Sequence, residues 1–172
     1  MLSAQTKVRT FLFADDGVIP NNPSLPLVIY RKAFDLTGAD DPAAVIEKAF
    51  EANGWVDCWR NGIYPYAHYH SRIHEALAVA RGRATVRFGG NEGEEIDIEA
   101  GDAAILPAGT GHQCLWASSA FEIVGAYPPT GAYDLCLASL THRETALKTI
   151  AEAPLPDSDP FFGKDGPLLQ IW

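Results

Sequence analysis

The chain has few basic residues and few sulfur-containing residues. Thirteen Lys and Arg stand against 22 Asp and Glu in 172 residues, which gives a formal net charge of −9. This charge repels phosphate backbones and anionic lipid headgroups, so we expect no nucleic-acid or membrane partner. The three cysteines, Cys58, Cys114 and Cys136, are widely spaced and form no CxxC pair, so they predict free thiols rather than a zinc or redox motif.

Long hydrophobic runs are also missing. No run approaches the roughly 20 apolar residues that a membrane-spanning helix needs, and the N-terminal segment has no apolar core or cleavage site typical of a signal peptide. We therefore expect a soluble, cytoplasmic protein. The 47% hydrophobic content suffices for a buried core and excludes intrinsic disorder.

Short strands separated by turns are the structure that the composition favours. The chain has 15 Gly, 12 Pro and 10% aromatic residues, and between residues 55 and 138 its apolar residues recur mainly with period two. The expected strands are 55–60, 63–70, 75–80, 83–88, 95–99, 103–106, 112–117, 121–127 and 133–137. Strands 75–80 and 83–88 are expected to pair around a turn at Arg81-Gly82. So many short strands without intervening helices predict an all-β fold, a closed barrel or a jelly roll.

One short helix is expected on each side of this barrel. In the N-terminal extension, residues 1–54, the LVIY run at 27–30 is a plausible edge strand, and Asp41-Pro42 begins a helix over about 42–53. In residues 139–172, Thr141 and Glu144 form a capping-box pattern for a helix that ends near residue 153. The remaining tail is expected to lack regular structure and to wrap over the barrel. Its expected anchors are Phe161, Phe162, Leu168, Leu169 and Trp172. We expect one domain overall, with the barrel over 55–138.

The most informative residues lie between 62 and 82. Residues two apart on a strand share a face, so His68 and His70 point their imidazoles to the same side. After a four-residue reversal, Glu75 opens a strand that we expect to pair with the first, which brings its carboxylate to the same place. Two imidazoles and a carboxylate suit a divalent transition metal at about 2.0 to 2.2 Å.

A further ligand is available downstream, where a turn containing Pro107 and Gly109 precedes His112. If that strand lines the same interior, His112 completes a site of three histidines and one glutamate that leaves one or two positions open. Any one of these histidines alone is more often a hydrogen-bonded core residue. Together they favour a metal site, because burying them without a cation leaves an unpaired charge.

Other candidate residues follow from the same alternation. It places Tyr64, Tyr66 and Trp116 on the ligand face, either as walls of a substrate pocket or merely as side chains that fill the barrel. His74 is expected to face away from the ligands, next to the site or on the surface. No residue is assigned a catalytic role.

Two stretches resemble the two motifs of the cupin family. The first follows G-x(5)-H-x-H-x(4)-E-x(6)-G from Gly62 to Gly82, and the second follows G-x(5)-P-x-G-x(2)-H from Gly101 to His112. Where the family usually has Asn near the end of the second motif, this chain has Trp116, which leaves the ligands intact. Segments such as HYHSRIHE and LPAGTGH are similar to those of the YjlB-like group of bacterial cupins.

The resemblance implies a cupin double-stranded β-helix, a jelly-roll barrel that holds one divalent metal on His68, His70, Glu75 and His112. Manganese, iron, nickel, copper and zinc all remain open. It favours a metal-dependent enzyme, of dioxygenase or isomerase/lyase type, that acts on a small polar metabolite. The alternatives are a non-catalytic cupin that binds or senses a small molecule anchored on the metal, and a purely structural cation site. A homodimer is also expected, because cupins commonly associate.

Overall fold

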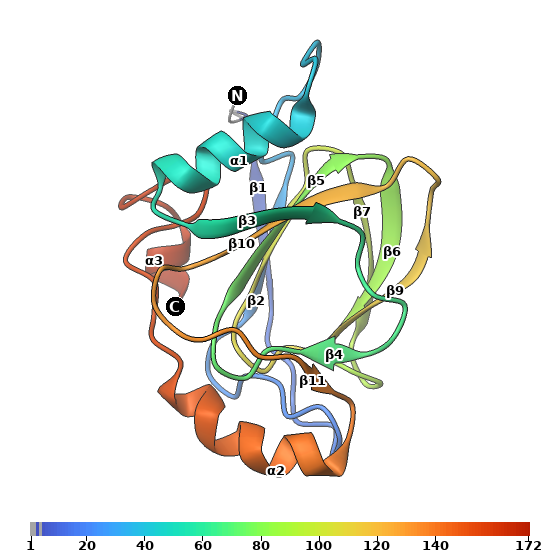
Figure 1. Ribbon diagram of the computed structural model, residues 1–172, viewed down its shortest axis with the longest axis vertical. Coiled ribbons are helices and arrows are strands. Elements are labelled where there is room, and N and C mark those ends of the chain that lie inside the picture. The colour runs from blue at the N-terminus through green and yellow to red at the C-terminus, as the bar shows by residue number, and fades with distance from the viewer. Residues whose placement is uncertain (1–2, 4) are drawn as a thin grey trace.

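Two antiparallel β-sheets face each other and form the body of the molecule (Figure 1), as seen in the computed structural model, which describes residues 3 and 5–172. The six-stranded sheet has the spatial order β1 (Lys7–Phe11), β2 (Leu27–Arg31), β8 (Ala103–Leu106), β5 (Glu75–Arg81), β10 (Glu122–Tyr127) and β3 (Val56–Asn61). The five-stranded sheet has the order β11 (Cys136–Leu137), β4 (His68–Tyr69), β9 (His112–Ala117), β6 (Arg83–Phe88) and β7 (Glu94–Glu99). The predicted all-β jelly-roll architecture is confirmed.

One hydrophobic core lies between the two sheets. Strand alternation sends Leu77 and Val79 inward from β5, and Val86 and Phe88 inward from β6. On β7 the isoleucines Ile96 and Ile98 are buried and the acidic residues between them are exposed, as their alternation predicts. Polar side chains replace this core at the end of the barrel where β4 and β9 begin.

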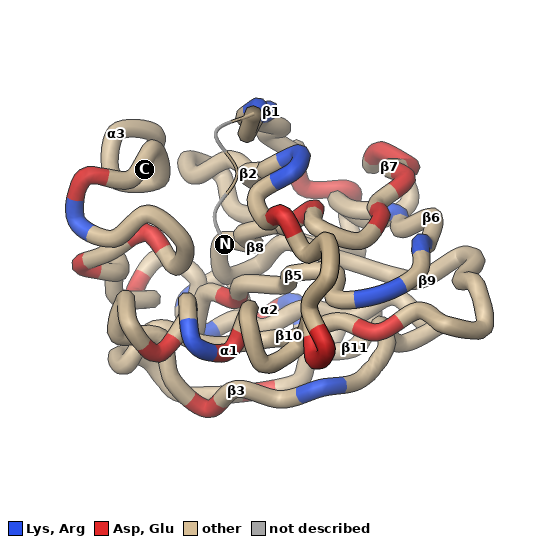
Figure 2. The backbone as a smooth tube through the Cα atoms, turned by 90° about the horizontal axis from the view of Figure 1, so that it is seen from above, with Lys and Arg blue, Asp and Glu red and all other residues tan. Residues whose placement is uncertain are grey.

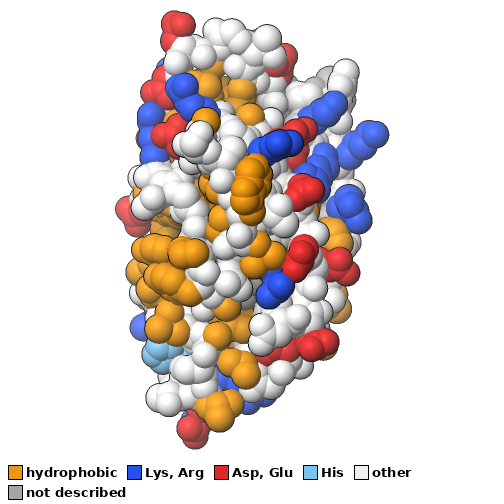
Figure 3. Space-filling view, turned by 90° about the vertical axis from the view of Figure 1, so that its right-hand side faces the viewer, with side chains coloured by type: hydrophobic (Ala, Val, Ile, Leu, Met, Phe, Trp, Pro, Cys, Tyr) orange, Lys and Arg blue, Asp and Glu red, His pale blue; other side chains and the backbone are white. Residues whose placement is uncertain are grey.

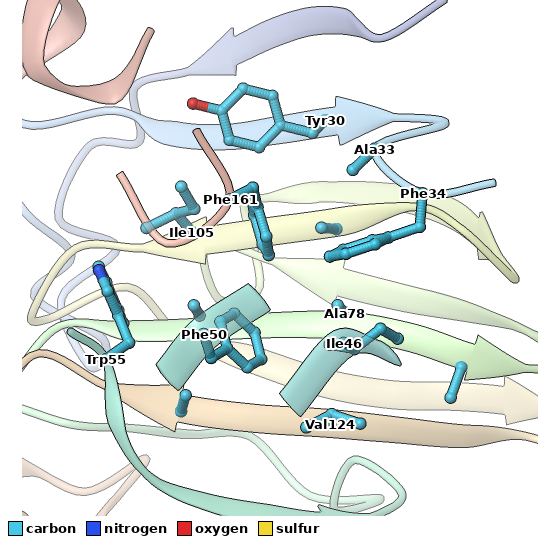
Figure 4. Packing of buried hydrophobic residues seen from close by; sticks show 14 of the residues in the cluster. Tyr30, Ala33, Phe34, Ile46, Phe50, Trp55, Ala78, Ile105, Val124 and Phe161 are labelled. Atoms are coloured by element: carbon cyan, nitrogen blue, oxygen red, sulfur yellow. The ribbon is translucent and has the colours of Figure 1, made fainter. Parts of the chain in front are cut away.

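A second core covers the outer face of the six-stranded sheet. The small side chains of β5 on that face, Ala76 and Ala78, leave room for helix α1 (Pro42–Ala52), which packs Ile46 and Phe50 on the sheet (Figure 4). Asp41 caps this helix by accepting a hydrogen bond from the backbone N–H of Ala44, as predicted. In Figure 1, α1 lies near one end of the molecule and α2 at the other.

The C-terminal residues return to this second core. Helix α2 (Leu140–Thr149) continues into a 3₁₀ turn over Ile150–Glu152, and its N-cap is Ser139 rather than the predicted Thr141. The tail then packs Phe161 and Leu168 against the outer face of the six-stranded sheet. It ends in a four-residue helix, α3 (Leu168–Ile171), that was not predicted.

Four expectations about the strands are wrong: the extent of one strand, the pairing across two turns, and the position of the LVIY strand. The strand expected over 63–70 is reduced to β4, because Pro65 has no N–H for a ladder and interrupts the pairing. Strand β5 pairs with β8 and β10, and β6 pairs with β7 and β9, so the turns at 71–74 and at Arg81-Gly82 join different sheets rather than hairpin partners. The LVIY segment is an interior strand, β2, because β1 pairs with it on its outer side. The division of the chain at residues 54 and 138 stays a prediction.

The surface is uneven in charge. Acidic residues are spread over the chain and include the exposed carboxylates of β7 (Figure 2). Figure 3, seen from the side on which β6 and β9 lie, shows hydrophobic side chains gathered toward its left and many charged side chains toward its right. Among the described residues, none of the helices combines the length and the hydropathy that crossing a bilayer requires.

Candidate metal centre

Three histidines, two on the five-stranded sheet and one directly after β4, meet in the interior of the barrel, near one of its ends. His68 lies on β4, His70 directly follows that strand, and His112 opens β9 opposite His68 in the ladder. All three are buried, and one ring nitrogen from each lies within 4.8 Å of the others. The pairing of two short strands therefore brings together residues that lie more than 40 positions apart in the sequence.

Backbone carbonyls fix the orientation of all three rings. The Nδ1 atom of His68 lies 3.0 Å from the carbonyl oxygen of Tyr66, and that of His112 lies 3.3 Å from the carbonyl oxygen of Thr110. The Nδ1 atom of His70 contacts the carbonyl oxygen of Asp134. A carbonyl only accepts, so each Nδ1 carries a hydrogen, and Nε2 is left as the possible ligand atom of each ring. Metal-binding histidines are commonly oriented in this way.

Glu75 completes the cluster from the opposite sheet. As the first residue of β5, it places Oε1 3.5 Å from Nε2 of His70 and Oε2 3.4 Å from Nε2 of His112. Its Oε2 atom is buried and has no hydrogen-bond partner among the described residues. Ligand atoms bound at about 2.1 Å to one octahedral ion lie about 3.0 Å apart when adjacent and about 4.2 Å apart when opposite. The two separations between carboxylate and imidazole, 3.5 and 3.4 Å, fall between these two values.

The protonation of these groups agrees with this arrangement. Burial lowers the pKa of His68 to about 3, so its ring is neutral at pH 7. For Glu75, burial favours the protonated form, but His70 and His112 outweigh it and hold the pKa of the carboxyl well below its usual range. Burial disfavours the charged form of His70, but the carboxylate of Glu75 outweighs it and raises the pKa of that imidazole. The centre thus contains an ionised carboxylate next to three imidazoles. Such a donor set fits a divalent transition metal.

A cavity of about 370 Å³ opens onto this cluster. Its walls come from β3, from the segment after it, from β10 and from the loop that follows β10. The lining residues are Trp59, Arg60, Asn61, Gly62, Ile63, Tyr64, His68, His70, Glu75, Leu77, His112, Tyr127 and Tyr133. This volume lies within the range of small-molecule sites, about 300 to 1,000 Å³.

A hydrogen-bonded pair forms the wall beside Glu75. Trp59 donates from Nε1 to the hydroxyl of Tyr127 over 3.1 Å, and the same hydroxyl faces the carboxylate of Glu75. Burial, followed by the charge of Glu75, raises the pKa of Tyr127, so its hydroxyl keeps its proton. The indole of Trp59 lies against Gly125, where a Cβ atom would come within 2.2 Å of it.

Of the three predicted pocket residues, one lines the cavity and two do not. Tyr64 lines the cavity, and Tyr66 stacks on Tyr64 with ring centroids 4.9 Å apart but does not line it. Trp116 lies outside, with the Arg83 guanidinium over its ring. The reason is a β-bulge on β9, where the register passes from Cys114 to Trp116 against consecutive residues of β6 and so reverses the alternation.

His74 is buried, which excludes the surface and leaves the other of its two expected positions, next to the site. Its Nδ1 accepts a hydrogen bond of 3.0 Å from the backbone N–H of Ala108, and its ring lies 4.8 Å from that of Trp172. Burial lowers the pKa of His74 to about 4. The imidazole therefore joins the turn before Glu75 to the turn before His112, and it contacts the C-terminal tail rather than the cluster.

Several residues of the site were not predicted from the sequence. Trp59, Tyr127 and Tyr133 line the cavity, and Asp134 accepts from His70 through its carbonyl and from Ser71 through its carboxylate. Tyr127 is the one aromatic residue of the GAYPP segment at 125–129, which is a weak signal for a site residue. No local pattern indicates that the loop after β10 folds back over His70.

Known proteins are similar to this chain at two levels. A family model described as "Cupin domain" matches residues 56–124. The protein named "Uncharacterized protein YjlB" from Bacillus subtilis (strain 168) is 42% identical over 168 residues, which cover 98% of both chains.

Solved structures are more distant. The dTDP-6-deoxy-D-glucose-3,5-epimerase RmlC of Legionella pneumophila has a TM-score of 0.41 at 13% identity, with 74% of each chain covered. The acireductone dioxygenase of Bacillus anthracis has a TM-score of 0.39 at 12% identity, with 73% of this chain and 83% of that chain covered.

Proposed function

The chain belongs to the cupin family, and we propose that it is a metal-dependent enzyme, of dioxygenase or isomerase/lyase type, that acts on a small polar metabolite. One divalent transition metal, such as manganese, iron, nickel or zinc, is held by His68, His70, Glu75 and His112. The observation that carries this proposal is the orientation of the three imidazoles, whose Nδ1 atoms are tied to carbonyls, while Nε2 of His70 and Nε2 of His112 face a buried carboxylate.

A cavity next to the cluster supports a reactive site over a structural cation site. Four protein ligands on a six-coordinate ion leave two positions, and the cavity is lined by the same four residues. A bound metal would act there as a Lewis acid or, if redox-active, would activate dioxygen. The protein's own residues orient the substrate and exclude bulk water, with the hydroxyl of Tyr127 beside Glu75 as the buried hydrogen-bonding group.

The test of this function is turnover by the metal-loaded protein. Purified protein is loaded separately with manganese, iron(II), nickel or zinc and incubated with a library of small polar metabolites. Substrate loss is followed by NMR, and dioxygen uptake by an electrode. His112→Ala is the inactive control. Substrate loss with dioxygen uptake indicates a dioxygenase, and substrate loss without uptake indicates an isomerase or lyase.

The second candidate is a non-catalytic cupin that binds or senses a small molecule anchored on the metal. It shares every residue of the centre with the first candidate, since the ligands and the cavity serve binding as well as catalysis. A metabolite that raises the melting temperature of the metal-loaded protein, with no loss of that metabolite over hours, supports binding alone.

We also propose a cytoplasmic homodimer. Strand β1 lies at the edge of the six-stranded sheet, outside β2, so it is the edge on that side to which a strand of a second copy could be added. Sedimentation velocity checks this, and a monomer mass at micromolar concentration would exclude the dimer.

A further inference from the structure

The cavity has little charge beyond the cluster itself. Among its described lining residues outside the cluster, Arg60 alone carries a charge. Its guanidinium donates to both carboxylate oxygens of Glu47, over 2.7 and 2.6 Å, and to Asp41 over 3.0 Å. All three guanidinium nitrogens are thus engaged by two carboxylates of the α1 region, which compete with a carboxylate or phosphate of a ligand for this cation.

Aromatic rings form a continuous wall from the histidines to the surface. The ring of Tyr133 lies 5.1 Å from that of His70 and 5.5 Å from that of Tyr127, and the ring of Tyr64 lies 5.1 Å from that of His68. Tyr127 is buried, whereas Tyr64 and Tyr133 are about half exposed. The wall therefore leads outward from the proposed metal, and such ring faces favour a flat partner.

The polar groups of this wall are uncharged. The hydroxyls of Tyr64 and Tyr133 form no hydrogen bond with any described residue, so both remain free to donate to a ligand. Phenol hydroxyls and the amide of Asn61 can donate to hydroxyl or carbonyl oxygens of a ligand, but they supply no positive charge to neutralise an ionised group.

From these contacts we infer that the site takes a flat ring-bearing ligand whose only anionic group is the one that binds the metal. The inference rests on the proposed metal centre and narrows its substrate class. The ring lies between Tyr64 and Tyr133, and the remaining polar atoms of the ligand are neutral oxygens. A small metabolite with a second carboxylate or a phosphate has no uncontested partner in this cavity.

Three hydroxamates with one metal-binding group test the inference by calorimetric titration of zinc-loaded protein. Acetohydroxamate has no ring, benzohydroxamate has one, and 4-carboxybenzohydroxamate adds a second anionic group. Burying a ring side chain contributes about 1.5 to 3 kcal/mol, which corresponds to a gain of at least about tenfold for benzohydroxamate over acetohydroxamate. The carboxylated probe is expected to bind no more tightly than benzohydroxamate.

Exposed aromatic residues supply the matched variants. Tyr133→Ala and Tyr64→Ala should each lower the affinity for benzohydroxamate severalfold and leave that for acetohydroxamate unchanged. Trp116→Ala, which removes an equally exposed ring outside the cavity, should change neither. Because all three residues are exposed, their loss should not unfold the protein.

The possible results are distinguishable. Equal binding of acetohydroxamate and benzohydroxamate, or a tenfold preference for the carboxylated probe, would overturn the inference and leave the metal centre intact. Absence of zinc, together with no binding of acetohydroxamate, would overturn the proposed metal centre and this inference with it. A ring preference that is lost in Tyr133→Ala and kept in Trp116→Ala supports it.

Discussion

Replacing Gly125 by Ala tests how the aromatic wall of the cavity is positioned. The backbone of Gly125 does not have a positive φ, so alanine fits the strand itself. The added Cβ, however, would lie 2.2 Å from two carbon atoms of the Trp59 indole. Carbon atoms make favourable contact at about 3.5 to 4.0 Å, so the indole has to move by more than about 1 Å.

The cost of this displacement has two parts. Overpacking by one methyl group typically costs about 1 to 3 kcal/mol. Moving the indole also breaks its hydrogen bond to Tyr127, which contributes about 1 kcal/mol. The sum is about 2 to 4 kcal/mol, and a protein of this size loses about 2 to 4 °C per kcal/mol. We expect Gly125→Ala to lower the melting temperature by about 4 to 16 °C.

A double-mutant cycle with Trp59→Ala measures the coupling. Without the indole, the methyl group at position 125 has open space, so Gly125→Ala should then cost less than about 0.5 kcal/mol. Urea denaturation of the wild type, the two single variants and the double variant gives the cost of Gly125→Ala with and without Trp59. Titration with benzohydroxamate shows whether ligand binding in the cavity changes as well. If Gly125→Ala costs the same with and without Trp59, or costs nothing with it, the proposed role of Gly125 is refuted.

Three further predictions concern the tail, the carboxylate and the metal. Asp159→Ala leaves the hydroxyl of Tyr30 and three backbone N–H groups without their buried acceptor. It should lower the free energy of unfolding, measured by urea denaturation, by about 3 to 5 kcal/mol, and a loss below about 1 kcal/mol would contradict this. Tyr127→Phe removes the hydroxyl beside Glu75 and should weaken zinc binding about 10-fold, as measured by competition with a fluorescent chelator. Unchanged zinc affinity would show that this hydroxyl does not influence the carboxylate of Glu75. Removal of metal by EDTA should lower the melting temperature by about 8 to 16 °C if metal had been present at about 1,000 times its dissociation constant, and no shift would argue against binding by the folded state.

The spacing of the motif residues predicted the candidate site better than the expected strand pairing did. His68, His70, Glu75 and His112 meet as the sequence predicts, although Glu75 comes from the opposite sheet rather than from a hairpin partner. A barrel interior gathers inward-facing residues from both sheets. The meeting of these four side chains was therefore predictable even though the predicted pairing of their strands was wrong, and their role as metal ligands stays a prediction.

Alternation fails where the chain leaves the regular ladder. One bulge on β9 moves Trp116 from the interior to the surface, and Pro65 shortens the strand that carries Tyr64 and Tyr66. A bulge depends on the partner strand and has no strong local signal. Period-two arguments therefore hold for Ile96 and Ile98 in the regular ladder of β7 but not for side chains beside the site.

Loops that fold back onto the site are the other feature that the sequence does not predict. Tyr133 and Asp134 reach His70 because the loop after β10 folds back, where the hydroxyl of Ser71 hydrogen-bonds both the carboxylate of Asp134 and the hydroxyl of Thr149. The burial of His74 likewise depends on Trp172, almost 100 residues away in the sequence. Contacts of this kind leave no periodic pattern in the sequence.

Metal content per chain tests the central claim most directly. Inductively coupled plasma mass spectrometry of the purified protein should find one divalent transition metal ion per chain in the wild type. The same content is expected in His142→Ala, whose histidine lies outside the cluster and accepts a hydrogen bond from Leu137. The double variant His68→Ala/His70→Ala should contain essentially none, and full metal content in that variant would contradict the proposed centre.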